Sequence, residues 1–164
     1  MEKCTFTEQD AEIVEQIGEV LGEMKFTIEQ DFCDQRSFGY RVTWEHGKSP
    51  FKALITYDPK GEAILAQISF RVIVPLAKFQ SAYAHLNEVN SELIFGHFTL
   101  CRHCGEVSFN SGFYNKTQDL FKEKFQANLE QILEEAHWGN SSLSESFSSP
   151  IPDNPKEDKK IEEL

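Results

Sequence analysis

The residues of this sequence that could do chemistry are concentrated in one short stretch, LCRHCGEV (residues 100–107). Cys101 and Cys104 have the spacing of a zinc knuckle or of a thiol–disulfide redox pair. The same stretch also has the composition of a hairpin turn, because Gly105 supplies a permissive backbone. These three interpretations predict different kinds of protein, and the rest of the chain helps to decide among them.

A structural zinc site needs four ligands, and Cys101 and Cys104 supply only two. The side chains that could complete such a site are Cys4, Cys33, His97 and His103. His97 and Cys101 would share a strand face, because alternate residues of a strand point the same way. No second pair at ligand spacing is present, so we expect no metal and no other cofactor; if a metal binds, Cys101 and Cys104 are its ligands.

The redox interpretation is also disfavoured by the local pattern. A redox pair normally opens a helix, whose dipole lowers the pKa of the attacking thiol, whereas Cys104 is followed by Gly105 and an expected strand. The sequence contains no Gly-rich phosphate loop and no recognisable nucleophile motif, and its five histidines are scattered. We therefore expect a turn at residues 101–105, no catalytic residues, and a protein that is not an enzyme.

The composition is that of one acidic globular domain. The chain has 164 residues and a net charge of −11, which argues against a nucleic-acid partner. Residues 1–34 carry 10 acidic and 2 basic side chains, whereas residues 35–138 carry 11 of each. The most apolar run, 63–74, is interrupted by Gln67, Ser69 and Arg71, so we expect no membrane insertion. Four cysteines without a secretory signal predict reduced thiols and a cytoplasmic location.

The acidic charge lies mainly on the first predicted helix. Thr7 and Asp10 resemble a capping box, and an apolar stripe follows from Ile13 to Met24. The opposite face carries a ridge of carboxylates, at Glu8, Glu12, Glu15, Glu19 and Glu23. Like charges four residues apart are mildly destabilising, so local stability does not explain this acidic ridge. It is either a solubilising face or a site for a basic partner, with Glu12, Glu15 and Glu19 as the candidate residues.

Alternating apolar residues predict strands at 39–46, 51–57 and 63–74, and residues 25–33 are a weaker candidate. Asp58-Pro59-Lys60-Gly61 is typical of a turn between two of them. Shorter strands at 95–101 and 106–113 would flank the Cys101–Cys104 turn. The alternation leaves three apolar side chains on outward faces as candidate partner-binding residues: Leu54, Leu65 and Ile73.

Two more helices are predicted, one from Pro75 to about Glu92 and one from about Thr117 to Trp138, with Gly139 as its stop. Asn87 and Asn90 near the end of the former are expected to cap and turn the chain locally. Residues 139–164 are rich in Ser, Pro and charge and predict a disordered tail after a domain at 1–138. The fold class is α+β, with three helices and an antiparallel sheet of about five strands in the order α-β-β-β-α-β-β-α.

The stretch LNEVNSELIFGHFTLCRHCGEVSFNSGFY resembles the YbjN-domain family, in which a Leu-Asn-x-x-Asn helix end leads through Gly-x-Phe into a hairpin and a closing helix. Leu86, Asn87 and Asn90 match the helix end, and Gly96 and Phe98 match the strand entry; Gly105 and Val107 match the return strand. The resemblance covers residues 8–138 in element order. The Cys-rich tip and the tail are outside the pattern.

The YbjN fold is itself similar to that of class I type III secretion chaperones, small acidic bacterial proteins that hold an effector segment in extended form before export. The resemblance implies a cytoplasmic protein-binding module that forms a homodimer and has no catalytic residues. A YbjN-type regulator of sensory transduction, acting through a protein partner, is the alternative. Phe79 and Tyr83 on the second long helix are candidates for the dimer interface, although each could equally be core.

Overall fold

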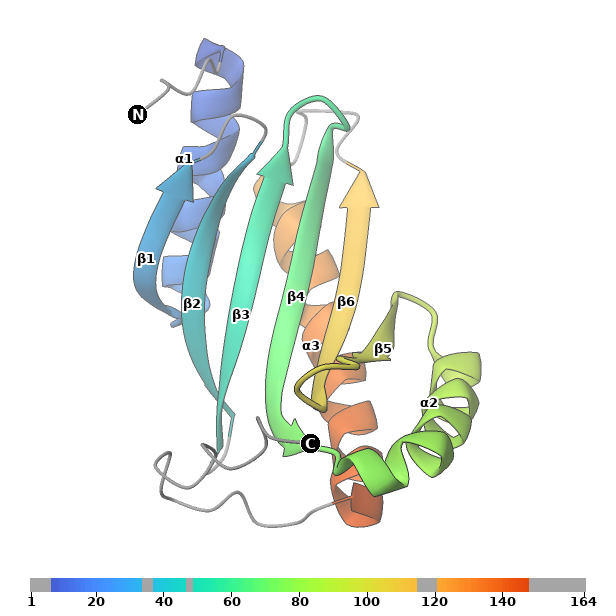
Figure 1. Cartoon of the computed structure of the whole chain (residues 1–164). Helices are drawn as coiled ribbons and strands as arrows, with labels where there is room; N and C mark the ends of the chain where they lie inside the picture. Colours follow the sequence, from blue (N-terminus) through green and yellow to red (C-terminus); the bar gives the residue numbers. More distant parts are fainter. Residues whose placement is uncertain (1–6, 34–36, 47–48, 115–120, 148–164) are drawn as a thin grey trace, which may run out of the picture.

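The structure, a computed structural model, describes residues 7–33, 37–46, 49–114 and 121–147. Two helices lie behind a single sheet, and a third lies beside one edge of it (Figure 1). The strands are β1 (Thr27–Cys33), β2 (Phe38–His46), β3 (Ser49–Asp58), β4 (Ala63–Ile73), β5 (Gly96–Leu100) and β6 (Glu106–Tyr114). The helices are α1 (Glu8–Glu23), α2 (Phe79–Glu92), which follows a 3-10 helix at Leu76–Lys78, and α3 (Phe121–Phe147).

The described strands form a six-stranded sheet in the order β1-β2-β3-β4-β6-β5, and every neighbouring pair is antiparallel. After β4 the chain passes through α2 and returns as β5 at the sheet edge, so that the following hairpin places β6 between β4 and β5. The predicted α+β class is confirmed, and the predicted order of elements holds except for one additional strand between the first two helices. The predicted number of about five strands is too low, because residues 27–33 form a full strand against β2.

Helix α1 begins at the predicted capping box. The backbone N–H of Asp10 donates to Thr7 Oγ1 (3.1 Å), and the N–H of Thr7 donates to Asp10 Oδ2 (2.9 Å). The Tyr57 hydroxyl on β3 donates to the other carboxylate oxygen of Asp10 (3.0 Å). Burial and this hydrogen bond raise the pKa of Tyr57 well above its usual value. Burial raises the pKa of Asp10, but the hydrogen bonds from Thr7 and Tyr57 outweigh it, and the net shift is downward.

Replacing Asp10 with asparagine should lower the free energy of unfolding by about 0.5–1 kcal/mol at pH 7, because the cap loses its charge. A carboxyl whose folded-state pKa is lowered stabilises the fold above its unfolded pKa, about 4, and loses that contribution as pH falls through the folded value. The difference between wild type and Asp10→Asn should therefore shrink below about pH 4 in urea titrations. Glu8→Gln, in the same turn, is the control; an equal pH-dependent difference there would contradict the role of Asp10.

The last helix is longer than predicted. Gly139 was expected to end it, but α3 continues to Phe147 and buries Leu143 and Phe147 in the core. A Cβ atom built on Gly139 would lie 2.2 Å from Cε2 of Phe98, so this glycine lets α3 approach β5 closely. The predicted tail boundary at 138 is therefore wrong for residues 139–147. The predicted helix start at Thr117 and the rest of the predicted disordered tail, 148–164, lie outside the described residues.

Replacing Gly139 with alanine should destabilise the protein by about 1–3 kcal/mol, because the added methyl displaces the Phe98 ring. Helix propensity alone predicts the opposite sign, a gain of about 1 kcal/mol. The matched control is Gly22→Ala in α1, where an added Cβ has no neighbouring atom within 4 Å. Thermal unfolding of both variants separates the two effects, and a stabilised Gly139→Ala would show that the contact with Phe98 is unimportant.

No helix within the described ranges is long and apolar enough to span a bilayer.

Cys33 is disulfide-bonded, so the expectation that all four cysteines are thiols is wrong for this residue. Cys101 and Cys104 are free thiols, as expected.

Candidate functional site

The two faces of the sheet have different surroundings. On β3, Ala53, Ile55 and Tyr57 are buried on the face that α1 and α3 cover, whereas Leu54 and Thr56 point to the opposite face. β4 repeats this alternation, with buried residues at 64, 66 and 68 and exposed residues at 65 and 67. No described helix covers the second face, which is turned to the viewer in Figure 1. We call it the uncovered face.

The uncovered face carries a groove with a volume of about 450 Å³. The groove is lined by residues of β3, β4 and the β5–β6 hairpin: Leu54, Thr56, Leu65, Ala66, Gln67, Phe95, Gly96, His97, Asn110, Ser111 and Gly112. Leu65 is 49% exposed and Phe95 is 43% exposed, so large apolar surfaces face the solvent there. The lining combines these apolar side chains with amides, a hydroxyl and an imidazole.

The strand register brings the groove residues together from distant parts of the chain. One row across the sheet runs from Leu54 through Gln67 and Asn110 to His97. The next row runs from Thr56 through Leu65 to Gly112. Gly112 has no side chain to fill the space beside Leu65, and a Cβ atom there would lie 2.8 Å from Cδ2 of Leu65. The glycine therefore contributes directly to the hollow.

Two side chains fix the edge strand that forms the groove's far wall. Asn90 on α2 donates to the carbonyl of Phe98 (3.0 Å) and accepts from its N–H (2.7 Å). Glu135 on α3 accepts from the N–H groups of Ile94 (3.2 Å) and Phe95 (3.0 Å). Asn90 was expected to bond to nearby backbone at the helix end; instead its side chain clamps a strand eight residues away in sequence. Sequence reasoning did not identify Glu135, which sits in an ordinary helical pattern.

Polar side chains also line this face between the groove and the hairpin tip, where Thr99, Ser108 and Asn110 form hydrogen bonds with one another. The Asn110 amide donates to Thr99 Oγ1 (2.9 Å), and Thr99 shares a hydrogen bond with the Ser108 hydroxyl (2.9 Å). These hydrogen bonds fix the orientation of the Asn110 side chain. A preorganised amide loses little entropy when a ligand binds beside it.

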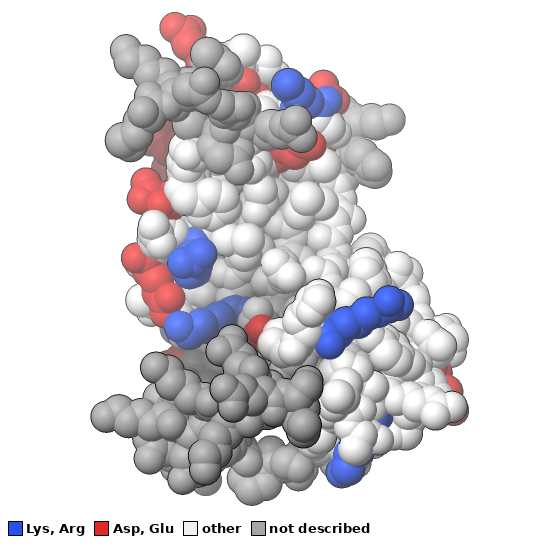
Figure 2. Space-filling model, viewed as in Figure 1, with Lys and Arg blue, Asp and Glu red and all other residues white. Residues whose placement is uncertain are grey.

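The charge on this face differs from that of the chain as a whole. In Figure 2 the centre of the face, over β3, β4 and β6, is mostly uncharged, and acidic side chains lie along the β1 side. Lys52 pairs with Glu29 (3.8 Å) between the groove and that edge. The groove lining is therefore apolar and hydrogen-bonding rather than acidic.

The predicted acidic ridge lies away from the groove. Tyr40, on the covered side of β2, donates its hydroxyl to the Val14 carbonyl of α1 (3.0 Å), which places α1 behind the sheet. Glu12, Glu15 and Glu19 are exposed on this helix and cannot line the uncovered face. Glu19 forms an ion pair with Lys122 of α3, and its hydrogen bond raises the pKa of that lysine. The candidate partner-binding residues therefore divide between two surfaces.

The remaining candidates are outside the groove. Ile73 is 46% exposed at the end of β4, beyond an irregularity in the pairing with β6, and lies beside Gly105. Phe79 and Tyr83 are half-buried, pack on the core and contact each other edge to face, with ring centroids 6.3 Å apart. A dimer through these two residues stays a prediction.

Cys101 and Cys104 form part of the predicted turn, between β5 and β6. Within the described ranges, no group of three or more His, Cys, Asp or Glu side chains could hold a metal ion. Cys33, His97 and His103 are the described residues that could have helped to complete a zinc site, and they are therefore not assembled with the two thiols into such a group. His97 belongs instead to the groove.

Comparison with known proteins identifies the fold. The sequence matches no protein-family model and no curated protein. A chain in the crystal structure of the ExsC–ExsE complex superposes with a TM-score of 0.50 at 14% identity, over 81% of this chain and 94% of that chain. YbjN from E. coli, a proposed transcription regulator, superposes with a TM-score of 0.52 at 14% identity, over 84% of this chain and 96% of YbjN. The predicted YbjN-like fold, resembling that of type III secretion chaperones, is confirmed.

Proposed function

We propose that this protein is a non-enzymatic binding module, like the type III secretion chaperones, that holds an extended segment of an exported protein before export. The observation that carries the proposal is the groove on the uncovered face, where exposed Leu65 and Phe95 flank hydrogen-bonding side chains. The similarity of the fold to a chain of the ExsC–ExsE complex, itself a protein–protein complex, supports a protein partner.

The groove suits an extended peptide for a physical reason. Alternate side chains of an extended segment point the same way, so apolar residues two apart can lie against Leu54 and Leu65. The amides of Gln67 and Asn110 stand in the same row as Leu54 and can bond to the peptide backbone. Burial of apolar surface supplies about 25 cal/mol per Å², and the polar groups fix the register.

The test is site-specific photocrosslinking in the native cell. A benzoylphenylalanine at position 67, in the groove, should crosslink to the N-terminal segment of an exported protein. The same residue at position 123, exposed on α3 at the covered side, is the control and should not give that product. Crosslinking at position 123 but not at 67 would place partner binding elsewhere and contradict the proposal.

The acidic ridge is proposed to attract basic partners over a distance rather than to contact them in the groove. Only the charges of Glu12 and Glu15 should be reversed in the test, because Glu19 is paired with Lys122. Glu12→Lys/Glu15→Lys should slow association with a basic partner segment about tenfold at low salt and leave dissociation unchanged. Stopped-flow binding at two salt concentrations measures this.

The control for the ridge carries the same change of net charge on another helix. Glu123→Lys/Glu130→Lys places two reversals on α3, and it should affect association less than the ridge variant. Equal effects of the two double variants would mean that only the net charge matters, and the ridge would then be a solubilising face.

We also propose that two copies of the chain form a homodimer without a change of fold. The interface would lie on α2 and include Phe79 and Tyr83. Native mass spectrometry of the untagged protein should show a mass of twice 18.8 kDa. Because both side chains also pack on the core, their replacement would disturb the fold; the solvent-facing Gln80 of α2 is the safer position for a disruptive Gln80→Arg. A monomeric wild type would refute the dimer but not the groove.

The alternative is a YbjN-type regulator that binds a signalling protein, and the similarity to YbjN favours it. The crosslinking experiment distinguishes the two functions, because a regulator should crosslink to a sensory or transcription protein. An exported protein as the product at position 67 would favour the chaperone-like function.

A further inference from the structure

The turn that carries Cys101 and Cys104 has a fixed backbone. The N–H of Cys101 donates to the Glu106 carbonyl, and the N–H of Gly105 donates to the Cys101 carbonyl, both at 2.9 Å. The Gly105 carbonyl accepts from Val74 N–H (2.8 Å), which attaches the turn to the end of β4. Gly105 has φ of +74°, and a Cβ atom there would lie 2.3 Å from the Val74 carbonyl oxygen. Glycine is therefore required at this position by both conformation and space.

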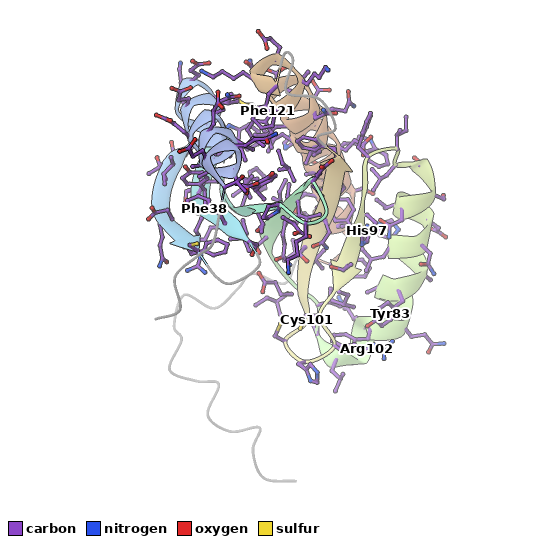
Figure 3. All side chains as sticks on the ribbon, turned by 90° about the horizontal axis from the view of Figure 1, so that it is seen from above. Phe38, Tyr83, His97, Cys101, Arg102 and Phe121 are labelled. Carbon is purple, nitrogen blue, oxygen red and sulfur yellow. The ribbon has the colours of Figure 1, made fainter. Side chains whose placement is uncertain are left out.

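Both thiols of this turn are exposed, and they lie three positions apart in the chain. Figure 3 shows Cys101 and the neighbouring Arg102 at the outer end of the β5–β6 hairpin, far from Phe121 at the start of α3. The backbone hydrogen bonds of Cys101 and Gly105 fix the two ends of the stretch that carries both thiols.

The two thiols of the turn differ in pKa. Hydrogen bonding to the Cys104 thiol, followed by the backbone N–H groups of Cys104 and His103, lowers the pKa of Cys101, against the opposing effects of burial and of the Glu106 carboxylate. The same thiol–sulfur hydrogen bond raises the pKa of Cys104, because Cys104 supplies the proton. In the redox pairs considered above a helix dipole stabilises the attacking thiolate, whereas here the donors of a tight turn do so.

From this geometry we propose that Cys101 and Cys104 form a redox-active dithiol that closes to a disulfide by exchange with a small-molecule disulfide of the glutathione class. Cys101 is the attacking thiol and Cys104 is the resolving thiol. The inference does not depend on the proposed binding function, because the hairpin tip lies outside the groove residues.

The reaction proceeds in two balanced exchanges. The Cys101 thiolate attacks one sulfur of the oxidised small molecule, forms a mixed disulfide and releases one small-molecule thiolate. Cys104 then loses its proton to solvent, and its thiolate attacks the Cys101 sulfur of the mixed disulfide, which releases the second small-molecule thiolate. The pair loses two electrons and two protons, the small-molecule disulfide gains the two electrons, and the released thiolates take up protons according to the pH.

A plain turn or a metal site explains these observations less well. A turn needs Gly105 but neither thiol, and exposed cysteines are uncommon in a surface turn because free thiols are among the most buried side chains. A metal site needs a third and a fourth ligand, and no described side chains form a group of three or more that could provide them. An exchange reaction needs only the two exposed thiols in one turn.

The experiment uses the full chain, reduced and then incubated in glutathione buffers of increasing oxidation. Remaining thiols are alkylated, and the peptides are mapped by mass spectrometry. Cys101 and Cys104 should become protected together, with the loss of two hydrogen atoms and no glutathione attached. In Cys104→Ser, glutathione should remain on Cys101, whereas Cys101→Ser should acquire glutathione on Cys104 about tenfold more slowly.

A synthetic peptide of residues 100–107 is the unfolded reference, and Cys101 in the folded protein should react about fivefold faster than in this peptide at pH 7. Both single variants should keep the melting temperature of the wild type, because the two side chains are exposed. Separate glutathione adducts on both residues, or rates for both variants equal to those of the peptide, would overturn the proposal.

Discussion

Replacing Phe98 with alanine is expected to lower the free energy of unfolding by about 3–5 kcal/mol. Phe98 is 3% exposed, and its ring lies 4.9 Å from that of Phe109 and 5.6 Å from that of Phe70, measured between centroids. It also fills the space beside Gly139 on α3. Removing this ring takes away contacts with β4, β6 and α3 at once, and the surrounding elements cannot all close on the cavity. Urea unfolding measures the loss.

The control is Phe95→Ala, three positions earlier on the approach to the same strand. Phe95 is 43% exposed and lies at the rim of the groove, so its loss should change stability by no more than about 0.5 kcal/mol. Equal losses of stability for the two variants would mean that any truncation near β5 lowers the free energy of unfolding. The contacts of Phe98 with β4, β6 and α3 would then have no special importance. Phe98→Leu, which retains most of the volume, should recover part of the stability.

The elements whose causes are local in sequence could be predicted. The first helix depends on a cap at Thr7 and Asp10 and on a stripe of apolar residues a few positions apart, and both were visible. The same holds for the turn between β3 and β4, where Asp58 accepts from the N–H of Lys60 (3.1 Å). In each case the residues that determine the conformation lie within four positions of one another.

The end of α3 could not be predicted, because its cause is a contact with residue 98. A glycine followed by serines ordinarily stops a helix, and nothing near Gly139 in the sequence indicates that an aromatic ring from β5 lies against it. Likewise, Asn90 is of a residue type that commonly caps helices, but its side-chain amide donates a hydrogen bond to the backbone carbonyl of Phe98. Long-range contacts changed the role of both residues without changing the local pattern.

Only part of the groove could be predicted, because its other residues are brought there by the order of the strands in the sheet. Alternation along the strands placed Leu54 and Leu65 on the outward face, and both line the groove. Their neighbours Asn110 and Gly112 depend on β6 lying between β4 and β5, an order that the chain sequence does not reveal. Ile73 follows the same alternation from Leu65 but lies past the pairing irregularity at the end of β4, so it is separated from the groove.

Replacing Leu65 with aspartate should weaken binding of the partner segment identified by crosslinking about 10- to 100-fold, while the fold stays intact. Leu65 is 49% exposed and stands beside Gly112, so a charge there meets solvent in the free protein. In the complex it would be buried against apolar side chains without a partner, which is unfavourable. Isothermal titration calorimetry with the synthetic segment measures the affinity, and the loss should appear mainly as faster dissociation.

The matched control is Leu76→Asp, which places the same charge at a leucine that is 78% exposed in the 3-10 helix, outside the groove. It should bind the segment as the wild type does. Ile73→Asp provides a second comparison on the same strand as Leu65. A larger loss of affinity for Ile73→Asp than for Leu65→Asp would move the binding surface from the groove to the end of β4, because the two residues are equally apolar and similarly exposed.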